Sequence, residues 1–178
     1  MGYWIKTGLA VSMLAASSIA QVFPPPLSRA AAILNSSQAK IGTVTVTEAP
    51  HGVLIRIEAA GLSAGWHGTH FHTVADCSDA GFKASGGHVH AMGAAGSVHG
   101  LLNAAGTDQG DLPNIFAASD GRVTVDLYAP GLSLQAADGR LSLLDADGSA
   151  LVIHAGPDDY RSQPIGGAGA RVACAPLR

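Results

Sequence analysis

The chain has 178 residues, enough for one domain with a hydrophobic core, and 13% of them are charged. The formal net charge is −3 and no run of basic residues occurs, which argues against nucleic acid as a partner. The 23 glycines and the small share of aromatic residues, 5%, are typical of short strands joined by many turns.

The N-terminus has the pattern of an export signal. Lys6 precedes an apolar stretch, 8–20, that is too short to span a bilayer and ends in a small-x-small cleavage site at 18–20. We therefore expect residues 1–20 to be a signal peptide and the protein to be periplasmic or secreted. Cleavage after Ala30 and a buried N-terminal helix are the alternatives. Without Lys6, nine Lys and Arg stand against thirteen Asp and Glu, a formal net charge of −4, and no segment suited to a membrane span follows.

An irregular stretch and two alternating segments come next. Residues 21–38 contain three consecutive prolines and an Ala-rich run, and we expect a flexible N-terminal segment before a domain at 39–178. Residues 41–47 and 53–58 alternate apolar and polar side chains around a His-Gly turn, which predicts a β-hairpin.

The alternating segment 66–72 contains three of the eight histidines. His70 and His72 are two residues apart, so on a strand both imidazoles point to the same face and form half of a metal site. His67 is expected to be structural. Further potential ligands follow in separate segments, as in a folded metal site: His88, His90, His99, Asp108, Asp111 and His154.

The rest of the chain contains two long irregular segments and several short strands. Residues 73–114 are rich in Gly, Ala, Asp and His, and a loop of that length is expected to be functional or tied down by a crosslink or a metal. Residues 155–170 form a second such loop. Strands are predicted at 122–128, 141–144, 151–154 and 171–175. With no helical period, about eight strands predict an all-β antiparallel barrel or sandwich with two long functional loops.

The two cysteines fit an exported chain, in which an even count predicts one disulfide, here Cys77–Cys174. Two buried free thiols are the alternative. The closed loop would contain nearly a hundred residues, for which chain entropy gives roughly 4 to 5 kcal/mol as an upper figure.

The donor types separate into two sites that share His88. A site of imidazoles with few carboxylates favours copper, and a mixture of imidazoles and carboxylates suits zinc. The four-nitrogen set consists of His70, His72, His88 and His154. The mixed set consists of His88, His99, Asp108 and Asp111.

These residues lie in motifs that resemble the copper/zinc superoxide dismutase family, in its exported bacterial branch. Seven pieces carry the resemblance and stand in the family's order: HGTHFH (67–72), Cys77, SGGH (85–88), His99-Gly100, DQGDLPN (108–114), VIHAGPDD (152–159) and GGAGARVAC (166–174). The resemblance covers roughly residues 40–178 and implies a Greek-key β-barrel or sandwich of about eight strands.

The resemblance also implies roles for single residues. It implies that copper is bound by His70, His72, His88 and His154, and zinc by His88, His99 and Asp111. His88 would bridge the two metals and carry a proton in catalysis, and Arg171 would guide the anionic substrate. Asp158 would link a copper histidine to a zinc histidine, and Cys77 and Cys174 would form the family's disulfide.

Two departures from the family pattern matter. Asp108 stands where the family usually has a zinc histidine, and the preserved spacing to Asp111 favours its ligating zinc in place of the imidazole. The alternative is that Asp108 turns to solvent and the site lacks zinc. The second departure is His90, which follows His88 closely and is an alternative bridge. We prefer His88, because two glycines precede it as in the family.

The expected function is dismutation of superoxide anion to O2 and H2O2 at a copper centre with an adjacent zinc site. Lys83 and Arg161 are candidates to help Arg171 attract the anion. The protein is expected to be a monomer or a homodimer. The alternative function is that of a non-catalytic exported copper carrier on the same fold, which would need neither Arg171 nor an open copper face.

Overall fold

The computed structural model describes residues 1–2, 24–91, 97–137 and 139–178. The predicted signal peptide therefore lies outside the described residues, except for its first two. Within the described ranges the chain forms these elements: β1 (Ser28–Asn35), β2 (Lys40–Ala49), β3 (Gly52–Ala59), β4 (Gly65–His72), the 3-10 helix η1 (Lys83–Ser85), β5 (Asp111–Ala117), β6 (Val123–Ala129), β7 (Leu132–Ser133), β8 (Leu141–Ser142), β9 (Ser149–His154) and β10 (Arg171–Leu177). No helix in these ranges has the length and apolar character needed to cross a bilayer.

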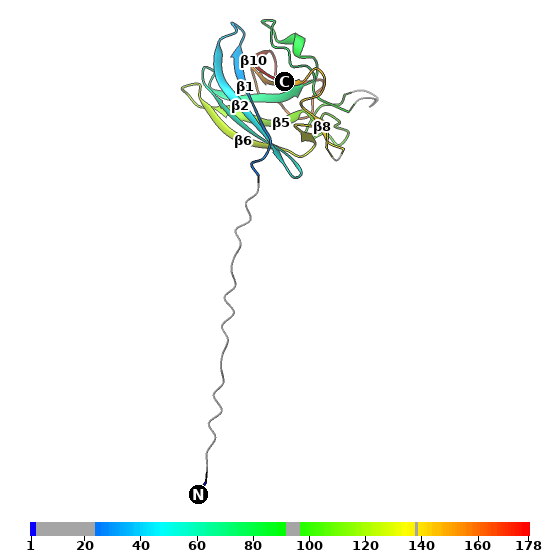
Figure 1. The fold of residues 1–178 in the computed structure, drawn as a ribbon. Helices are drawn as coiled ribbons and strands as arrows, with labels where there is room; N and C mark the ends of the chain where they lie inside the picture. The colour runs from blue at the N-terminus through cyan, green and yellow to red at the C-terminus, as the bar shows by residue number, and fades with distance from the viewer. Residues whose placement is uncertain (3–23, 92–96, 138) are drawn as a thin grey trace.

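Eight strands form one antiparallel sheet in the order β5-β4-β9-β10-β1-β2-β3-β6. The two outer strands, β5 and β6, contact each other, so the sheet closes almost completely into a barrel (Figure 1). β3 lies next to β6, whereas β4, the next strand along the chain, lies between β5 and β9. The connection from β3 to β4 therefore joins strands that are not neighbours, which is a Greek-key connection. The predicted all-β fold class is confirmed.

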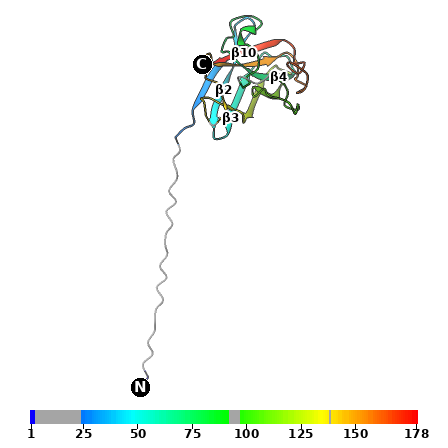
Figure 2. The same ribbon diagram turned by 90° about the vertical axis from the view of Figure 1, so that its right-hand side faces the viewer.

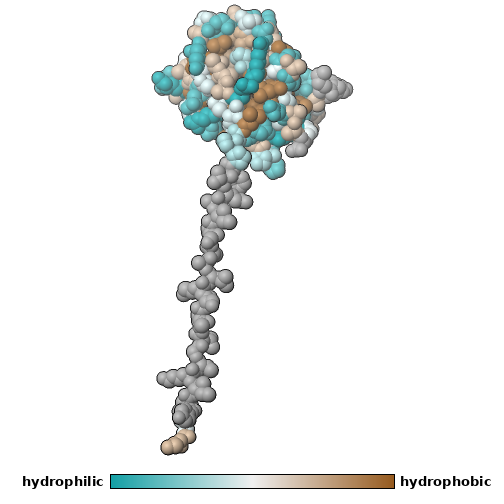
Figure 3. Space-filling model, viewed as in Figure 1, coloured by the Kyte–Doolittle hydropathy of each residue, from teal (hydrophilic) through white to brown (hydrophobic). Residues whose placement is uncertain are grey.

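The barrel core follows from the alternation of the strand sequences. β2 and β3 form the predicted hairpin, with Val44, Val46, Ile55 and Ile57 fully buried and polar side chains on the outer face. The outer face turned to the viewer in Figure 3 accordingly carries hydrophilic and hydrophobic residues side by side.

Part of the expected flexible segment 21–38 is a strand, so that prediction is wrong for residues 28–35. They form β1, which pairs with β2 on one side and with β10 on the other. The run of three alanines at 30–32 has no alternation to reveal a strand. It pairs with β2, and the end of the strand, Leu34 and Asn35, pairs with β10. Cleavage after Ala30 would cut β1, which favours the earlier cleavage site.

The predicted loop 73–114 is shorter than expected, because β5 begins at Asp111. The burial pattern of β5 breaks its alternation, with Leu112, Ile115 and Ala117 buried. The pairing of β5 with β4 shifts register between His67 and Thr69, and this irregularity explains the broken pattern. Of the strand predicted at 141–144, only β8 forms, and it pairs with β7 outside the barrel sheet.

Both faces of β9 are buried, one by the barrel core and the other by the long loops. Leu151 and Ile153 point into the barrel core, whereas Ala150 and Val152 pack against Cys77, Phe82 and Cys174 in a second cluster. In Figure 2, β4 lies beside the orange strand β9, and the red strand β10 follows on the other side of β9. Residues 73–91 and 97–110 of the first loop and residues 155–170 of the second therefore lie over the outer wall of the barrel at β4 and β9.

Candidate metal centre

The histidines of β4 and β9 meet on this outer wall. Phe71 points into the core, so its neighbours His70 and His72 point outward under the loops, where both are fully buried. His70 lies opposite Val152 on β9, and His154 ends the same strand. His88 comes from the first loop, and its backbone pairs with that of His72 in an isolated antiparallel β-bridge.

Four histidines form a cluster with converging ring nitrogens, the "histidine cluster". Their ligand atoms lie within 4.8 Å of one another, and the members are His70, His72, His88 and His154. In each ring one buried nitrogen has no hydrogen-bond partner among the described residues: His70 Nδ1, His72 Nε2, His88 Nε2 and His154 Nε2. Buried polar atoms normally have partners, so four unpaired nitrogens that face one another fit a bound copper ion.

The second nitrogen of each ring fixes its orientation. His72 Nδ1 donates to the Gly86 carbonyl at 2.9 Å, and His154 Nδ1 donates to the Gly169 carbonyl at 3.0 Å. Because a carbonyl only accepts, both Nε2 atoms are bare acceptors in the neutral rings. Such hydrogen bonds on the far nitrogen fix the tautomer of metal-ligating histidines.

Burial keeps most of this cluster neutral. It lowers the pKa of His72 to about 2 and that of His154 to about 4, and it also lowers the pKa of His70. Neutral imidazole is the form that binds metals. His88 differs: burial opposes protonation, but the carboxylates of Asp108 and Asp111 raise the pKa of His88.

The other face of His88 meets the mixed set of residues, the "carboxylate cluster" of His88, His99, Asp108 and Asp111. Asp111 Oδ1 lies 2.9 Å from His88 Nδ1 and 3.0 Å from His99 Nδ1, and Asp108 Oδ2 lies 3.4 Å from His88 Nδ1. The Asp108 side chain is 1% exposed and points inward, not to solvent. The ligand atoms that lie within 4.8 Å of one another on this side belong to His70, His88, His99 and Asp111, so Asp108 stands at the edge of the group and approaches it through His88. The donor types fit zinc.

Asp158 connects the two clusters. Its Oδ2 accepts from His70 Nε2 at 2.9 Å, and its Oδ1 accepts from His99 Nε2 at 3.0 Å. Burial works against ionisation, but hydrogen bonds from His70, the Tyr160 amide and His99 lower the pKa of Asp158 to about 2. Gly166 leaves room for this carboxylate, because a Cβ there would overlap with it.

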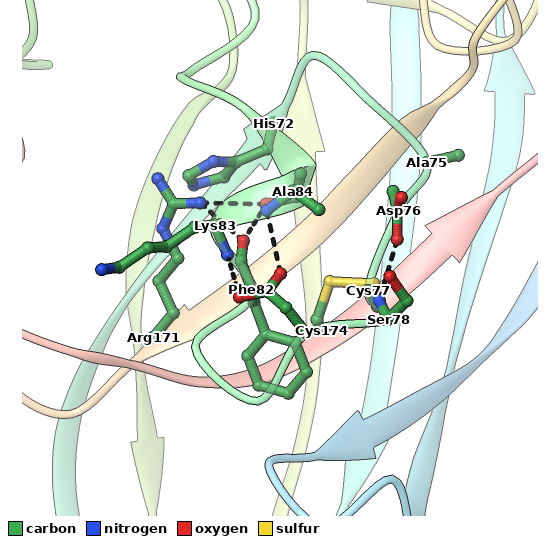
Figure 4. Close-up of a disulfide and its surroundings, with 12 residues drawn as sticks. His72, Ala75, Asp76, Cys77, Ser78, Phe82, Lys83, Ala84, Arg171 and Cys174 are labelled. Carbon is green, nitrogen blue, oxygen red and sulfur yellow. Dashed lines mark hydrogen bonds between the residues drawn. A yellow bond between two sulfur atoms is a disulfide. The ribbon is translucent and has the colours of Figure 1, made fainter.

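Arg171 lies at the edge of the histidine cluster and is anchored by the first loop. Cys77 and Cys174 are bonded, as predicted, and tie that loop to β10. The Arg171 guanidinium donates to the carbonyls of Phe82 at 2.6 Å and Gly86 at 2.8 Å. Figure 4 shows it beside the His72 ring. A fixed positive charge therefore stands next to the histidine cluster.

The remaining histidines of this region are outside both clusters. His90 Nδ1 donates to the His88 carbonyl at 2.7 Å, so it supports the loop. His67 is buried with its ring nitrogens 2.7 Å from the His154 carbonyl and 2.8 Å from the Ser63 carbonyl, which agrees with the structural role expected for it.

Several contributors have no signal in the sequence. The carbonyls of Gly86 and Gly169 orient two rings, and Ser97 donates to Asp108. Backbone acceptors carry no residue-specific signature, and the serine is separated from its partner by an irregular loop. Only the folded structure brings these groups together.

The barrel and its two clusters define the chain as a metal-binding β-barrel protein. The chain belongs to the copper/zinc superoxide dismutase family, whose sequence model, described as Copper/zinc superoxide dismutase (SODC), matches residues 40–177. The predicted family is thereby confirmed.

Relatives in sequence and structure agree with this membership. A Cu-Zn superoxide dismutase of Caulobacter vibrioides is 57% identical over 150 residues, which cover 84% of this chain and 85% of the relative. Cu-Zn superoxide dismutase 2 of Aquifex aeolicus is 38% identical over 161 residues, 90% of this chain and 92% of that one. A crystal structure of a SOD-like protein from Bacillus subtilis superposes with a TM-score of 0.78 at 32% identity, covering 84% of this chain and 98% of that one. The Cu/Zn superoxide dismutase from Brucella abortus gives 0.67 at 28% identity, covering 85% and 100%.

Proposed function

We propose that this chain is an exported superoxide dismutase, which converts superoxide anion to O2 and H2O2 with copper and zinc as cofactors. The observation that carries the proposal is the set of four buried, unpaired imidazole nitrogens beside an anchored guanidinium. Family membership and the dismutase relatives support the same reaction.

The copper ligands in this proposal are His70, His72, His88 and His154. Copper, when bound, supplies the one-electron redox chemistry of both halves of the reaction. The chain supplies the rest: His72 and His154 are held neutral by burial, and backbone carbonyls fix their tautomers.

The zinc ligands in this proposal are His88, His99, Asp108 and Asp111. Two carboxylates formally neutralise the ion. The carboxylate that replaces an imidazole lies close enough to His88 to share the metal on its Nδ1 side. His88 then faces the histidine cluster through Nε2, the atom that can hold a proton for the product.

Arg171 is the substrate-binding cation in this proposal. A guanidinium is charged at any pH relevant here and presents a fork of donors to a small anion. Lys83, in η1, is exposed and lies on the same side as Arg171 (Figure 4). Both charges favour entry of an anion over entry of a cation, so the copper-carrier alternative is not favoured.

Export is the second part of the proposal. The segment 1–20 has the composition of a signal peptide, and the disulfide between Cys77 and Cys174 is typical of an oxidising compartment such as the periplasm. Mass analysis of the protein from a periplasmic extract should give a chain that begins at Gln21. A full-length chain retained in the cytoplasm would contradict export. Sedimentation of the same sample would decide between a monomer and a homodimer.

The metal assignment is tested by His154→Ala, with His51→Ala as the matched control. His51 is an exposed histidine in the β2–β3 turn. We expect His154→Ala to lose copper and superoxide consumption together, because one of four ligands is gone. His51→Ala should keep both. Full activity in His154→Ala would refute the ligand set.

A further inference from the structure

Ser97 holds one oxygen of the Asp108 carboxylate. Its Oγ donates to Asp108 Oδ1 at 2.6 Å, whereas Oδ2 of the same carboxylate faces His88 Nδ1 at 3.4 Å. The two oxygens of Asp108 therefore have different surroundings: one is bound to a hydroxyl and the other points at the imidazole of the carboxylate cluster.

Asp111 also has a donor from the protein on one oxygen. Its Oδ2 accepts from the Gly100 amide at 2.7 Å and lies 2.9 Å from His99 Nδ1, and its Oδ1 faces His88 Nδ1 at 2.9 Å. Each carboxylate of the cluster thus has a donor from the protein on one oxygen. The donor to Asp111 is a backbone amide, which no side-chain substitution removes, whereas the donor to Asp108 is a side chain.

A carboxylate at position 108, where the family usually has an imidazole, explains why the hydroxyl of Ser97 is useful. An imidazole offers a metal one nitrogen, but a carboxylate in its place offers two oxygens and can bind in a bidentate mode. Bidentate binding raises the coordination number and suits larger, harder cations. Zinc sites of protein ligands are mostly four-coordinate and tetrahedral.

We propose that Ser97 is a positioning residue that restricts Asp108 to one metal-facing oxygen, so that this carboxylate imitates the single donor of an imidazole and the site stays tetrahedral. The inference rests on the proposed function, in which Asp108 is a zinc ligand. Residues that orient metal ligands typically contribute a factor of 10 to 100 in affinity, and we expect about tenfold here because the hydrogen bond is part-exposed.

The experiment uses the full mature protein with its copper site loaded and compares wild type with Ser97→Ala, Ser97→Thr and Ser162→Ala. Ser162 is the matched control, an exposed serine that donates to the carboxylate of Asp159, a residue of neither cluster. Zinc affinity is measured by competition with a chromogenic chelator. Co²⁺ in the zinc site reports coordination number, because tetrahedral Co²⁺ absorbs visible light more strongly than five- or six-coordinate Co²⁺.

We expect Ser97→Ala to weaken zinc about tenfold and to lower the Co²⁺ absorption, with Ser97→Thr restoring both and Ser162→Ala changing neither. Unchanged copper content in the same samples shows that the barrel is folded. If Asp108→Ala loses zinc but Ser97→Ala matches wild type in affinity and spectrum, the inference is overturned and the ligand set stands. If Asp108→Ala binds zinc as wild type does, the ligand set itself fails, and the role of Ser97 with it.

Discussion

Replacing Asp158 by asparagine should weaken copper far more than zinc. The side chain keeps its shape, but one carboxylate oxygen becomes an NH2 group, which donates and does not accept. Oδ1 accepts from two donors, the Tyr160 amide at 2.6 Å and His99 Nε2 at 3.0 Å, whereas Oδ2 accepts from His70 Nε2 alone. The amide oxygen of asparagine should therefore take the Oδ1 position and leave the NH2 facing His70.

The magnitude follows from the hydrogen bond that is lost. A hydrogen bond to a charged group contributes about 1.5 to 3 kcal/mol, and loss of a group that orients a metal ligand usually costs a factor of 10 to 100 in affinity. We expect copper affinity of Asp158→Asn to fall by about that factor, because the ring of His70 loses its acceptor. Zinc affinity should fall only a few-fold, because His99 keeps its acceptor and loses only its charge.

The assay is competition of each metal against chelators of known affinity, on Asp158→Asn and on Asp120→Asn as a control for the lost charge. Asp120 is an exposed carboxylate whose charged partner is Arg122, remote from both clusters. The control should bind both metals as wild type does. A larger loss of zinc than of copper in Asp158→Asn, or no loss of either, would refute the reasoning.

Three further predictions concern the substrate cation, the disulfide and pH. Arg171→Ala should keep copper but lower the rate of superoxide consumption about tenfold at low salt and flatten its salt dependence; an unchanged rate would argue against steering. Cys174→Ser should lower the free energy of unfolding by up to roughly 4 to 5 kcal/mol in chemical denaturation, because a crosslink over 97 residues is lost; an unchanged midpoint would contradict this. In metal-free protein, neutral His154 contributes to the free energy of unfolding, and this contribution is complete above pH 6.5. It falls by about 3 kcal/mol as the pH drops toward the folded pKa of about 4, because the unfolded state binds the proton first. His154→Gln should remove that part of the pH dependence of unfolding, and an identical pH profile would exclude it.

The sequence predicted those parts of the fold that depend on alternation. The β2–β3 hairpin and the outward-facing pair on β4 follow from side-chain periodicity, and β9 follows from its continuous apolar run, which suits a strand buried on both faces. β1 and β5 escaped prediction for two different reasons. The alanines of β1 do not distinguish an inner from an outer face, and the register shift opposite β5 breaks its period.

The candidate site was predictable in its residues but not in its connections. Histidines and carboxylates carry recognisable chemistry. The structure brings the four predicted copper ligands together, and it groups three of the four predicted zinc ligands, His88, His99 and Asp111, with Asp108 at their edge. The orientation of Asp108 by Ser97, and of two histidine rings by carbonyls, depends on loop conformations that have no periodic signal. The resemblance to a family pointed to the link through Asp158, and its distances to His70 and His99 come from the fold.

The most direct test is to measure metal content and superoxide consumption on one preparation of the mature protein after loading with copper and zinc. Two clusters on each chain predict one copper and one zinc per chain, with a rate of superoxide consumption that rises in proportion to bound copper. Protein that binds copper in the histidine cluster yet consumes no superoxide above the uncatalysed rate would contradict the proposed enzyme and favour the copper carrier.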